Sequence, residues 1–165
     1  MYFRKLMKGD GQKLHALVAQ CPPLDTNSAY LNFLQCTHFA DTSVAVESHS
    51  QLYGAITGYY QPEAPDTLFV WQVAVAQAAR GKGLAKKMLC HLVDAGLGGG
   101  LKFIETTITR DNRASWALFE GLADYYQVSL TSNIWLDQSE HFAGLHDSEY
   151  LVRIGPFNSP LGISP

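Results

Sequence analysis

The chain has 165 residues, of which 47% are hydrophobic and 16% are charged, and its formal net charge is -3. These values fit a globular protein of one domain that is long enough to bury a substantial core. The small negative charge argues against a general affinity for nucleic acid or for anionic membranes.

The cysteines and the N-terminal residues indicate the compartment. Cys21, Cys36 and Cys90 are widely spaced and form no C-x-x-C pair, so neither a zinc site nor a disulfide framework is predicted. The opening residues, "MYFRKLMKGDG", lack the apolar run of a secretory signal. No stretch approaches the roughly 20 apolar residues that a membrane helix needs. We therefore expect a reduced, cytoplasmic protein.

Two helices and a series of strands are predicted in the first half of the chain. Asp10 is expected to cap a helix over 11–21, and the break "CPPLDTNS" ends it. Asn27 or Ser28 is expected to cap a second short helix. Strand-like runs then occupy 42–48, 52–61 and 68–75. The short polar links between these runs suit antiparallel neighbours.

The second half alternates helices with strands. A helix is expected from Gly83 to about Gly96, and the segment 131–149 has no clear period and is predicted as a long loop. The remaining elements are a strand at 102–109, a helix over 111–126 and a closing strand at 150–155. This order predicts an α/β fold with a mixed sheet in one domain over 1–157, followed by a disordered tail over 158–165.

One stretch, "VWQVAVAQAARGKGLAKKML", runs from an apolar strand through a basic, glycine-bearing turn into a helix. A P-loop would need G-x-x-x-x-G-K-[ST], which is absent, and a dinucleotide fingerprint would need glycine in place of Lys86. The pattern R-x-x-G-x-[GA] fits, with Arg80, Gly83 and Ala85. A short strand-to-helix turn with solvated lysines is the alternative interpretation.

The chemistry of this turn favours an anion. The N-terminus of a helix presents unpaired backbone N–H groups and the positive end of the helix dipole. Gly81 and Gly83 would let a pyrophosphate approach the backbone because they carry no Cβ, while Arg80 and Lys82 add positive charge.

The strand–turn–helix–strand–helix run, with Asn112 after the second strand, resembles the GNAT superfamily of N-acetyltransferases over about Phe3 to Gly155. The resemblance implies a single-domain GNAT fold, with a mixed and mostly antiparallel sheet flanked by helices. It also implies acetyl-CoA as co-substrate. The residues implied to bind it are Val73, Val75, Arg80, Gly81, Lys82, Gly83, Leu84, Ala85 and Asn112, with backbone groups of Val73 and Val75 contacting the acetyl carbonyl and the pantetheine arm.

A closer resemblance is to the diaminobutyrate acetyltransferases of ectoine synthesis. It is carried by "PLDTNSAYLNFLQCTHFADTSVAVE", "YYQPEAPDTLFVWQVAV", "ARGKGLAKKML", "IETTITRDNRASWALFEGLA" and "HDSEYLVRIGP". The resemblance implies transfer of an acetyl group to the side-chain (gamma) amine of L-2,4-diaminobutyrate. It further implies a homodimer in a pathway to a compatible solute. The residues implied to bind this substrate are Asp25, Trp71 and Glu105, with Tyr30 and His146 near them. Thr107 is a further candidate, because it lies on the same strand face as Glu105.

The residue types suit a small substrate with two amines, although each has a simpler explanation. Glu105 interrupts an otherwise apolar or hydroxylated strand, where a buried carboxylate is costly unless paired, and an ion pair with a core arginine would explain it equally. Asp25 could be a turn residue. Alternation places Phe69, Trp71, Val73 and Val75 on one face, where core packing is the default for the tryptophan.

A mechanism follows from these expectations. Glu105 is the candidate base, directly or through water, and the Val73 N–H would stabilise the oxyanion. Many GNAT relatives carry a tyrosine as general acid where this chain has Phe119, which cannot donate a proton. Tyr125, Tyr126, Ser115 or water could substitute.

The histidines do not predict a metal site. His141 and His146, near Asp147 and Glu149, match no common zinc spacing, so no metal is expected. Two further functions compete with the one described: a GNAT enzyme acting on another diamine, a polyamine or a peptide amine, and a non-catalytic acyl-CoA-binding domain. Glu105 and Trp71 favour catalysis, since a sensor needs no carboxylate beside the thioester.

Overall fold

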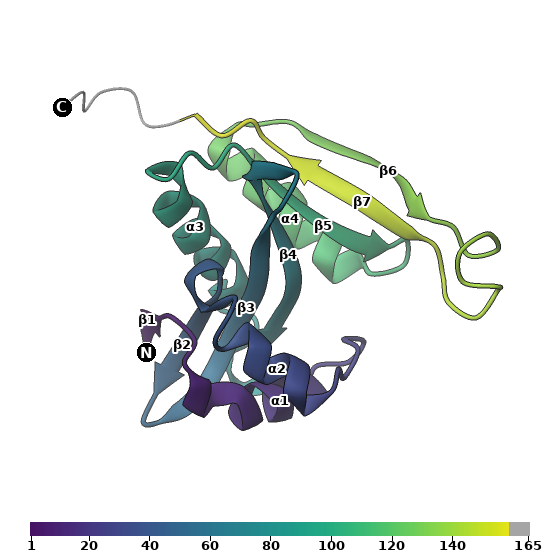
Figure 1. The fold of residues 1–165 in the computed structure, drawn as a ribbon. Helices are drawn as coiled ribbons and strands as arrows, with labels where there is room; N and C mark the ends of the chain where they lie inside the picture. The colour runs from purple at the N-terminus through teal and green to yellow at the C-terminus, as the bar shows by residue number, and fades with distance from the viewer. Residues whose placement is uncertain (159–165) are drawn as a thin grey trace. The chain divides into compact units, whose positions relative to one another are not determined.

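The computed structural model describes residues 1–158, and Figure 1 shows their helices and strands. The helices are α1 (Gly11–Ala19), α2 (Ala29–Gln35), α3 (Leu84–Leu97) and α4 (Arg113–Tyr126), with short 3-10 helices η1 (Lys8–Asp10), η2 (Ala40–Thr42) and η3 (Gln77–Ala79). The strands are β1 (Tyr2–Arg4), β2 (Val44–Ser48), β3 (Gln51–Gln61), β4 (Ala64–Val75), β5 (Phe103–Thr109), β6 (Leu130–Leu136) and β7 (Glu149–Ile154). The tail expected over 158–165 lies, beyond residue 158, outside the described residues.

The strands follow the hydrogen-bonded order β1-β2-β3-β4-β5-β7-β6 in one seven-stranded sheet. Strands β4 and β5 pair in parallel over three residues, Thr67–Phe69 with Phe103–Glu105. The pairs β1–β2, β2–β3, β5–β7 and β6–β7 are antiparallel. The predicted mixed, mostly antiparallel sheet flanked by helices is therefore confirmed.

The chain divides into two compact units. The first comprises Met1–Tyr60 and Val70–Asp94, and the second comprises Gln61–Phe69 and the chain from Ala95 onward. The boundaries of the domain predicted over 1–157 stay a prediction. Within residues 1–158, no helix has both the length and the apolar character required to cross a membrane.

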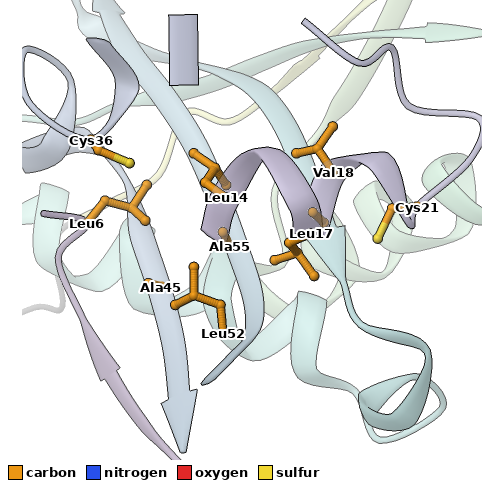
Figure 2. Close-up of a cluster of buried hydrophobic side chains, with 10 residues drawn as sticks. Leu6, Leu14, Leu17, Val18, Cys21, Cys36, Ala45, Leu52 and Ala55 are labelled. Atoms are coloured by element: carbon orange, nitrogen blue, oxygen red, sulfur yellow. The ribbon is translucent and has the colours of Figure 1, made fainter. Parts of the chain in front are cut away.

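The core of the first unit forms where α1 packs against the sheet. Leu14, Leu17 and Val18 recur at helical spacing and are all buried. Figure 2 shows them in a cluster with side chains of β2 and β3, including Ala45, Leu52 and Ala55. The apolar periodicity of the sequence thus produces both the helix and the face by which it binds the sheet.

Gly54 and Ala55 show why helices cover both faces of β3 in this unit. Successive strand residues point to opposite faces. Ala55 belongs to the cluster under α1, whereas a Cβ at Gly54 would lie 2.9 Å from Met88 Cε and 3.4 Å from Leu84 Cδ2 of α3. Glycine at position 54 therefore permits the close approach of α3 to the sheet.

The start of α1 differs from the prediction. Asp10 occupies the N-cap position but makes no side-chain capping bond. Its carboxylate instead accepts hydrogen bonds from Arg4 (2.6 and 2.9 Å) and from the Met7 amide (2.8 Å), and Arg4 also pairs with Glu47 of β2. The guanidinium outcompetes the helix amides for this buried carboxylate. For α2, Ser28 rather than Asn27 is the cap, accepting from the Leu31 amide at 3.2 Å.

The second unit packs α4 against β5 and β7. Phe119 and Leu122 are buried on one side of this helix, as its periodicity predicts. Trp116 Nε1 donates to the Thr109 carbonyl at 3.1 Å, and its ring meets Tyr150 of β7 edge-on at 6.3 Å between centroids. The paired indole N–H explains how this large ring is accommodated beside the sheet.

The prediction of a loop over 131–149 is wrong for the first part of that segment, which forms strand β6. Strand β6 pairs with β7 from Leu130↔Ile154 onward, and residues 131–135 are exposed on both faces. An edge strand exposed on both faces shows no alternation of apolar and polar residues, because neither face is buried. Two smaller differences are that β1 was not predicted and that β4 begins at Ala64 rather than Leu68.

Candidate active site

The glycine-bearing turn connects η3 to α3, and its backbone is not covered by side chains at Gly81 and Gly83. Gly81 and Gly83 have φ angles of 72° and 67°, the left-handed region that glycine adopts without strain. Apart from the glycine and its two chain neighbours, no described residue has a heavy atom within 4 Å of the place where a Cβ would stand on either glycine. The first bond of the helix runs from Lys87 N to Gly83 O at 3.1 Å, so the amides of Leu84 and Ala85 have no carbonyl within the helix. The turn has the features of an anion cradle.

Both basic side chains of the turn bond to backbone carbonyls nearby. Arg80 Nε donates to Val75 O at 3.0 Å, and Lys82 Nζ donates to Ala78 O at 3.0 Å. Cys21 Sγ donates to the same Val75 carbonyl at 3.4 Å. These bonds keep the two positive charges at the turn, and they occupy the Val75 carbonyl within the first unit.

One face of β4 carries residues that the sequence placed together. Phe69, Trp71, Val73 and Val75 alternate with the more deeply buried Leu68, Val70, Gln72 and Ala74. Trp71 is 40% exposed, so the alternative explanation of core packing does not account for it. Its ring meets the Tyr59 ring edge-on at 6.1 Å between centroids. The Trp71 ring is therefore paired with another aromatic ring but remains partly exposed to solvent.

Asp25 and Tyr30 lie close in sequence, on and after the loop that joins α1 to α2. Both side chains are exposed, and Tyr30 is 71% exposed at the start of α2. The Asp25 backbone carbonyl accepts hydrogen bonds from Asn27 N (3.1 Å) and from Gln72 Nε2 (2.9 Å). The main chain at Asp25 is thus tied to β4 while its carboxylate faces solvent.

Glu105 is 6% exposed in β5, and both of its oxygens are hydrogen-bonded. Arg153, its cross-strand neighbour on β7, donates from Nη1 to Oε1, and Gln61 Nε2 donates to Oε2 at 2.5 Å. The Arg153 side chain is 37% exposed and stacks over the Phe103 ring at 3.7 Å. The arginine pair considered from the sequence is therefore present. Each carboxylate oxygen has a second lone pair that can accept from an ammonium.

Three further candidates lie in the second unit. Thr107 follows Glu105 by two residues in β5 and is half-buried on the same face. Asn112 caps α4, its side-chain oxygen accepting from Ser115 N at 3.2 Å. His146 lies in the loop between β6 and β7, where Nδ1 donates to the Asp147 carbonyl at 2.7 Å and Nε2 lies 3.9 Å from Glu149 Oε1.

His141 has a role within its own loop. The Asp137 amide donates to His141 Nδ1 at 2.8 Å, and the Asp137 carboxylate accepts from the amides of Ser139 and Glu140. Those two amide bonds hold the pKa of Asp137 below its usual value. In the part of the chain that the structure describes, no three His, Cys, Asp or Glu residues gather as a possible metal site.

Sequence reasoning did not single out Gln61 and Arg153 as partners of Glu105. Arg153 interrupts the apolar run "YLVRIG" much as Glu105 interrupts its own strand, and this parallel was the available signal. Gln61 ends β3, where a polar residue is ordinary, so nothing in the pattern distinguishes it.

Known proteins with similar sequences decide the family. The sequence model of the Acetyltransferase (GNAT) family matches residues 12–123. The L-2,4-diaminobutyric acid acetyltransferase of Methylotuvimicrobium alcaliphilum is 48% identical, over 90% of this chain and 87% of the relative. The enzyme of the same name from Vibrio parahaemolyticus is also 48% identical, over 92% of this chain and 84% of the relative.

The chain belongs to the GNAT acetyltransferase family and, within it, to the L-2,4-diaminobutyric acid acetyltransferases. The resemblance stated from the sequence is confirmed, and this GNAT protein is an N-acetyltransferase.

Solved structures agree with this assignment. The diaminobutyrate acetyltransferase EctA from Paenibacillus lautus, solved with its substrate L-2,4-diaminobutyric acid and coenzyme A, has a TM-score of 0.89 to this chain at 36% identity. The comparison covers 98% of both chains. The ribosomal-protein-S18-alanine N-acetyltransferase of Escherichia coli has a TM-score of 0.68 at 13% identity, which shows the shared GNAT fold alone.

Proposed function

We propose that this acetyltransferase moves the acetyl group of acetyl-CoA to the side-chain (gamma) amine of L-2,4-diaminobutyrate. The observation that carries the proposal is the similarity, over nearly the whole chain, to the P. lautus enzyme solved with diaminobutyrate and coenzyme A. The geometry of each unit supports it. The first unit offers an anion cradle and the second a buried, hydrogen-bonded carboxylate.

The turn of Arg80 to Ala85 would hold the pyrophosphate of acetyl-CoA. The open space above Gly81 and Gly83 fits a phosphate against the backbone, and the amides of Leu84 and Ala85 would donate to its oxygens. The charges of Arg80 and Lys82 would offset the phosphate charge. Val73, Val75 and Asn112 complete the proposed coenzyme site, and the first two act through backbone groups.

The amine substrate carries two ammonium groups and one carboxylate, so acidic partners are required. Asp25 and Glu105 are the proposed partners of the ammonium groups. The partly exposed indole of Trp71 and the exposed phenol of Tyr30 are further proposed contacts of the substrate. Thr107 and His146 are the proposed additional contacts.

Catalysis requires the attacking amine to lose one proton. Glu105 would take that proton, directly or through a water, which typically contributes about 10²–10⁴ in rate. The neutral amine then forms a bond to the thioester carbonyl carbon, and the Val73 N–H would stabilise the oxygen that becomes negative. The C–S bond then breaks and releases the coenzyme A thiolate, while the nitrogen gives up its second proton to water and the thiolate takes up a proton from water. The products are the acetylated amine and free coenzyme A.

The cellular role belongs to the proposal as well. Acetylation of the gamma amine would yield the precursor of ectoine, a compatible solute made under osmotic stress. We propose that the enzyme works in the cytoplasm as a homodimer, with no nucleic acid or membrane partner. Its net charge of -3 is consistent with the last point.

An amine panel tests the substrate. Release of coenzyme A thiol would be followed with diaminobutyrate, ornithine, lysine, spermidine and an alanine peptide at equal concentrations. The proposal predicts the largest kcat/KM for diaminobutyrate. Faster turnover of spermidine or of the peptide would indicate the alternative, a GNAT enzyme for another amine, and no turnover of any amine would favour an acyl-CoA-binding protein.

A further inference from the structure

Gln72 is a polar residue on the buried face of β4. It is 6% exposed, and its neighbours on that face, Val70 and Ala74, are each 1% exposed. Its Nε2 donates to the Asp25 carbonyl at 2.9 Å, across 47 residues of sequence. Its Oε1 is buried and has no hydrogen-bond partner among residues 1–158.

The orientation of this amide follows from its partner. A backbone carbonyl can only accept, so the nitrogen of Gln72 must face Asp25, and the opposite orientation would set two oxygens against each other. The oxygen is then left without a donor, which is unfavourable for a buried polar atom. A leucine or methionine would fill this position without that cost, so core packing does not account for glutamine.

The hydrogen bond acts on the loop between α1 and α2, which is also held by the packing of Leu24 against the core cluster and by the bond from Cys21 to Val75. Asp25 lies between the end of α1 at Ala19 and the start of α2 at Ala29, and its side chain is exposed. Within the loop, the Asp25 carbonyl closes a turn with the Asn27 amide at 3.1 Å. The amide of Gln72 adds a direct hydrogen bond from β4 to this turn, at Asp25 itself.

We propose that Gln72 is a positioning residue for the amine substrate: by holding the main chain of Asp25, it fixes where the Asp25 carboxylate meets the ammonium group. The inference rests on the proposed function, in which Asp25 binds diaminobutyrate. Gln72 acts through Asp25 and does not itself touch the substrate. Without the anchor, the carboxylate samples more positions, and binding must supply the ordering that the fold supplies now.

Gln72→Met tests the anchor, because methionine keeps the unbranched shape and removes both the donor and the unpaired oxygen. The KM for diaminobutyrate should rise at least about fivefold, while kcat stays within about twofold and acetyl-CoA affinity is unchanged. The melting temperature should be equal or higher, since the unpaired oxygen is gone. If this variant fails to fold, Gln72→Leu gives the same readouts.

Thr67→Val is the matched control. Thr67 is also buried in β4, its hydroxyl bonds only to the adjacent Asp66 at 3.1 Å among the contacts described, and valine preserves its shape. Its KM for diaminobutyrate should stay within about twofold of the unmodified enzyme. A rise equal to that of Gln72→Met would mean that any loss of a polar group from β4 has this effect, and it would overturn the proposal.

A double-mutant cycle separates positioning from an independent effect. Asp25→Asn removes the carboxylate but keeps the backbone carbonyl, so the Gln72 bond persists. If Gln72 acts through Asp25, adding Gln72→Met to Asp25→Asn should change KM by less than about twofold, whereas independent effects would multiply. Multiplied effects would overturn the inference, as would an unchanged KM in Gln72→Met beside a raised KM in Asp25→Asn. An unchanged KM in Asp25→Asn alone would remove Asp25 from the substrate site. It would overturn both the proposed role of Asp25 and the inference about Gln72.

Discussion

Arg153 and Glu105 face each other across the antiparallel strands β7 and β5, and the guanidinium donates a hydrogen bond to the carboxylate. Gln61 donates to the other carboxylate oxygen at 2.5 Å. Glu105 is thereby held in one orientation at a buried position. A fixed carboxylate of this kind suits proton removal from an ammonium, because the acceptor needs no rearrangement when the substrate arrives.

Glu105→Gln separates a base from a binding group. Glutamine keeps the shape but removes the negative charge and the basic site. If Glu105 is the base, kcat at neutral pH should fall at least about a hundredfold and recover partly at high pH, where the amine loses its proton unaided. Steady-state kinetics across pH would measure this. A raised KM with nearly constant kcat would instead assign Glu105 to ammonium binding. Glu120→Gln, on the exposed face of α4, should leave both constants within about twofold.

Coenzyme affinity should depend on the turn before α3. A Cβ at Gly83 meets no atom within 4 Å beyond its chain neighbours, but valine there is strained by the positive φ angle and places its Cβ where the pyrophosphate would approach. We expect Gly83→Val to weaken acetyl-CoA binding at least about tenfold in calorimetry. Gly98→Val, where a Cβ also meets nothing within 4 Å, should not change it. Unchanged affinity in a folded Gly83→Val protein would refute the phosphate assignment.

The cluster of Arg4, Asp10 and Glu47 should make the free energy of unfolding decrease at low pH. Burial would raise the pKa of Asp10, but hydrogen bonds from Arg4 and the Met7 amide outweigh it and hold the pKa below its usual value of 3.8. A lowered folded pKa contributes stability that is complete above the unfolded value and is lost as pH falls through the folded value. The pH-dependent loss should therefore lie below about pH 4.

Removing the Asp10 charge tests the same cluster at neutral pH. Asp10→Asn leaves a partly buried guanidinium with Glu47 as its remaining carboxylate partner, and denaturant unfolding should show a loss near the lower end of about 3–5 kcal/mol. Asp41→Asn is the control, because the Lys5–Asp41 pair is exposed and should contribute roughly 0–1 kcal/mol. Equal losses in the two variants would contradict a special role for the buried cluster.

The leaving thiolate should need no tyrosine. Phe119 is 2% exposed within α4 and cannot donate a proton. A thiol with the pKa of about 8.5 that is usual for cysteine leaves readily as its thiolate, which water can then protonate. Tyr125→Phe and Tyr126→Phe should therefore each keep kcat within about threefold, and Phe119→Tyr should not speed the reaction. We expect Tyr30→Phe to raise the KM for diaminobutyrate. If Tyr30→Phe instead lost about a hundredfold in kcat at constant KM, and its plot of kcat against pH lost the decline at high pH, Tyr30 would be the general acid.

Local patterns predicted the elements and the anion turn, because each depends on residues near one another in sequence. The helical spacing of Leu14, Leu17 and Val18 and the glycines at 81 and 83 are examples. The partners of Glu105 could not be predicted in this way. Arg153 is 48 residues away, and its position depends on the register of β5 with β7. The edge strand β6 was missed because its exposed residues carry no alternation.

Trp71 and Gln72 show, within a single strand, that a local pattern cannot predict contacts with distant parts of the chain. Alternation grouped Trp71 with Phe69, Val73 and Val75, and in the structure these residues alternate with the more deeply buried Gln72 and its neighbours. It could not tell which face would be open, and it left core packing as the alternative for the tryptophan, which is 40% exposed. The bond of Gln72 to a loop carbonyl leaves no trace in the sequence, because the acceptor belongs to the backbone.

The position of the acetyl group in the product tests the central claim most directly. The enzyme would be incubated with acetyl-CoA and L-2,4-diaminobutyrate labelled with ¹⁵N at both nitrogens, and the amide nitrogen would be assigned by NMR. The account predicts a single product with the acetyl on the gamma nitrogen and a free alpha amine. A product acetylated on the alpha nitrogen, or no acetylated diaminobutyrate at all, would contradict it.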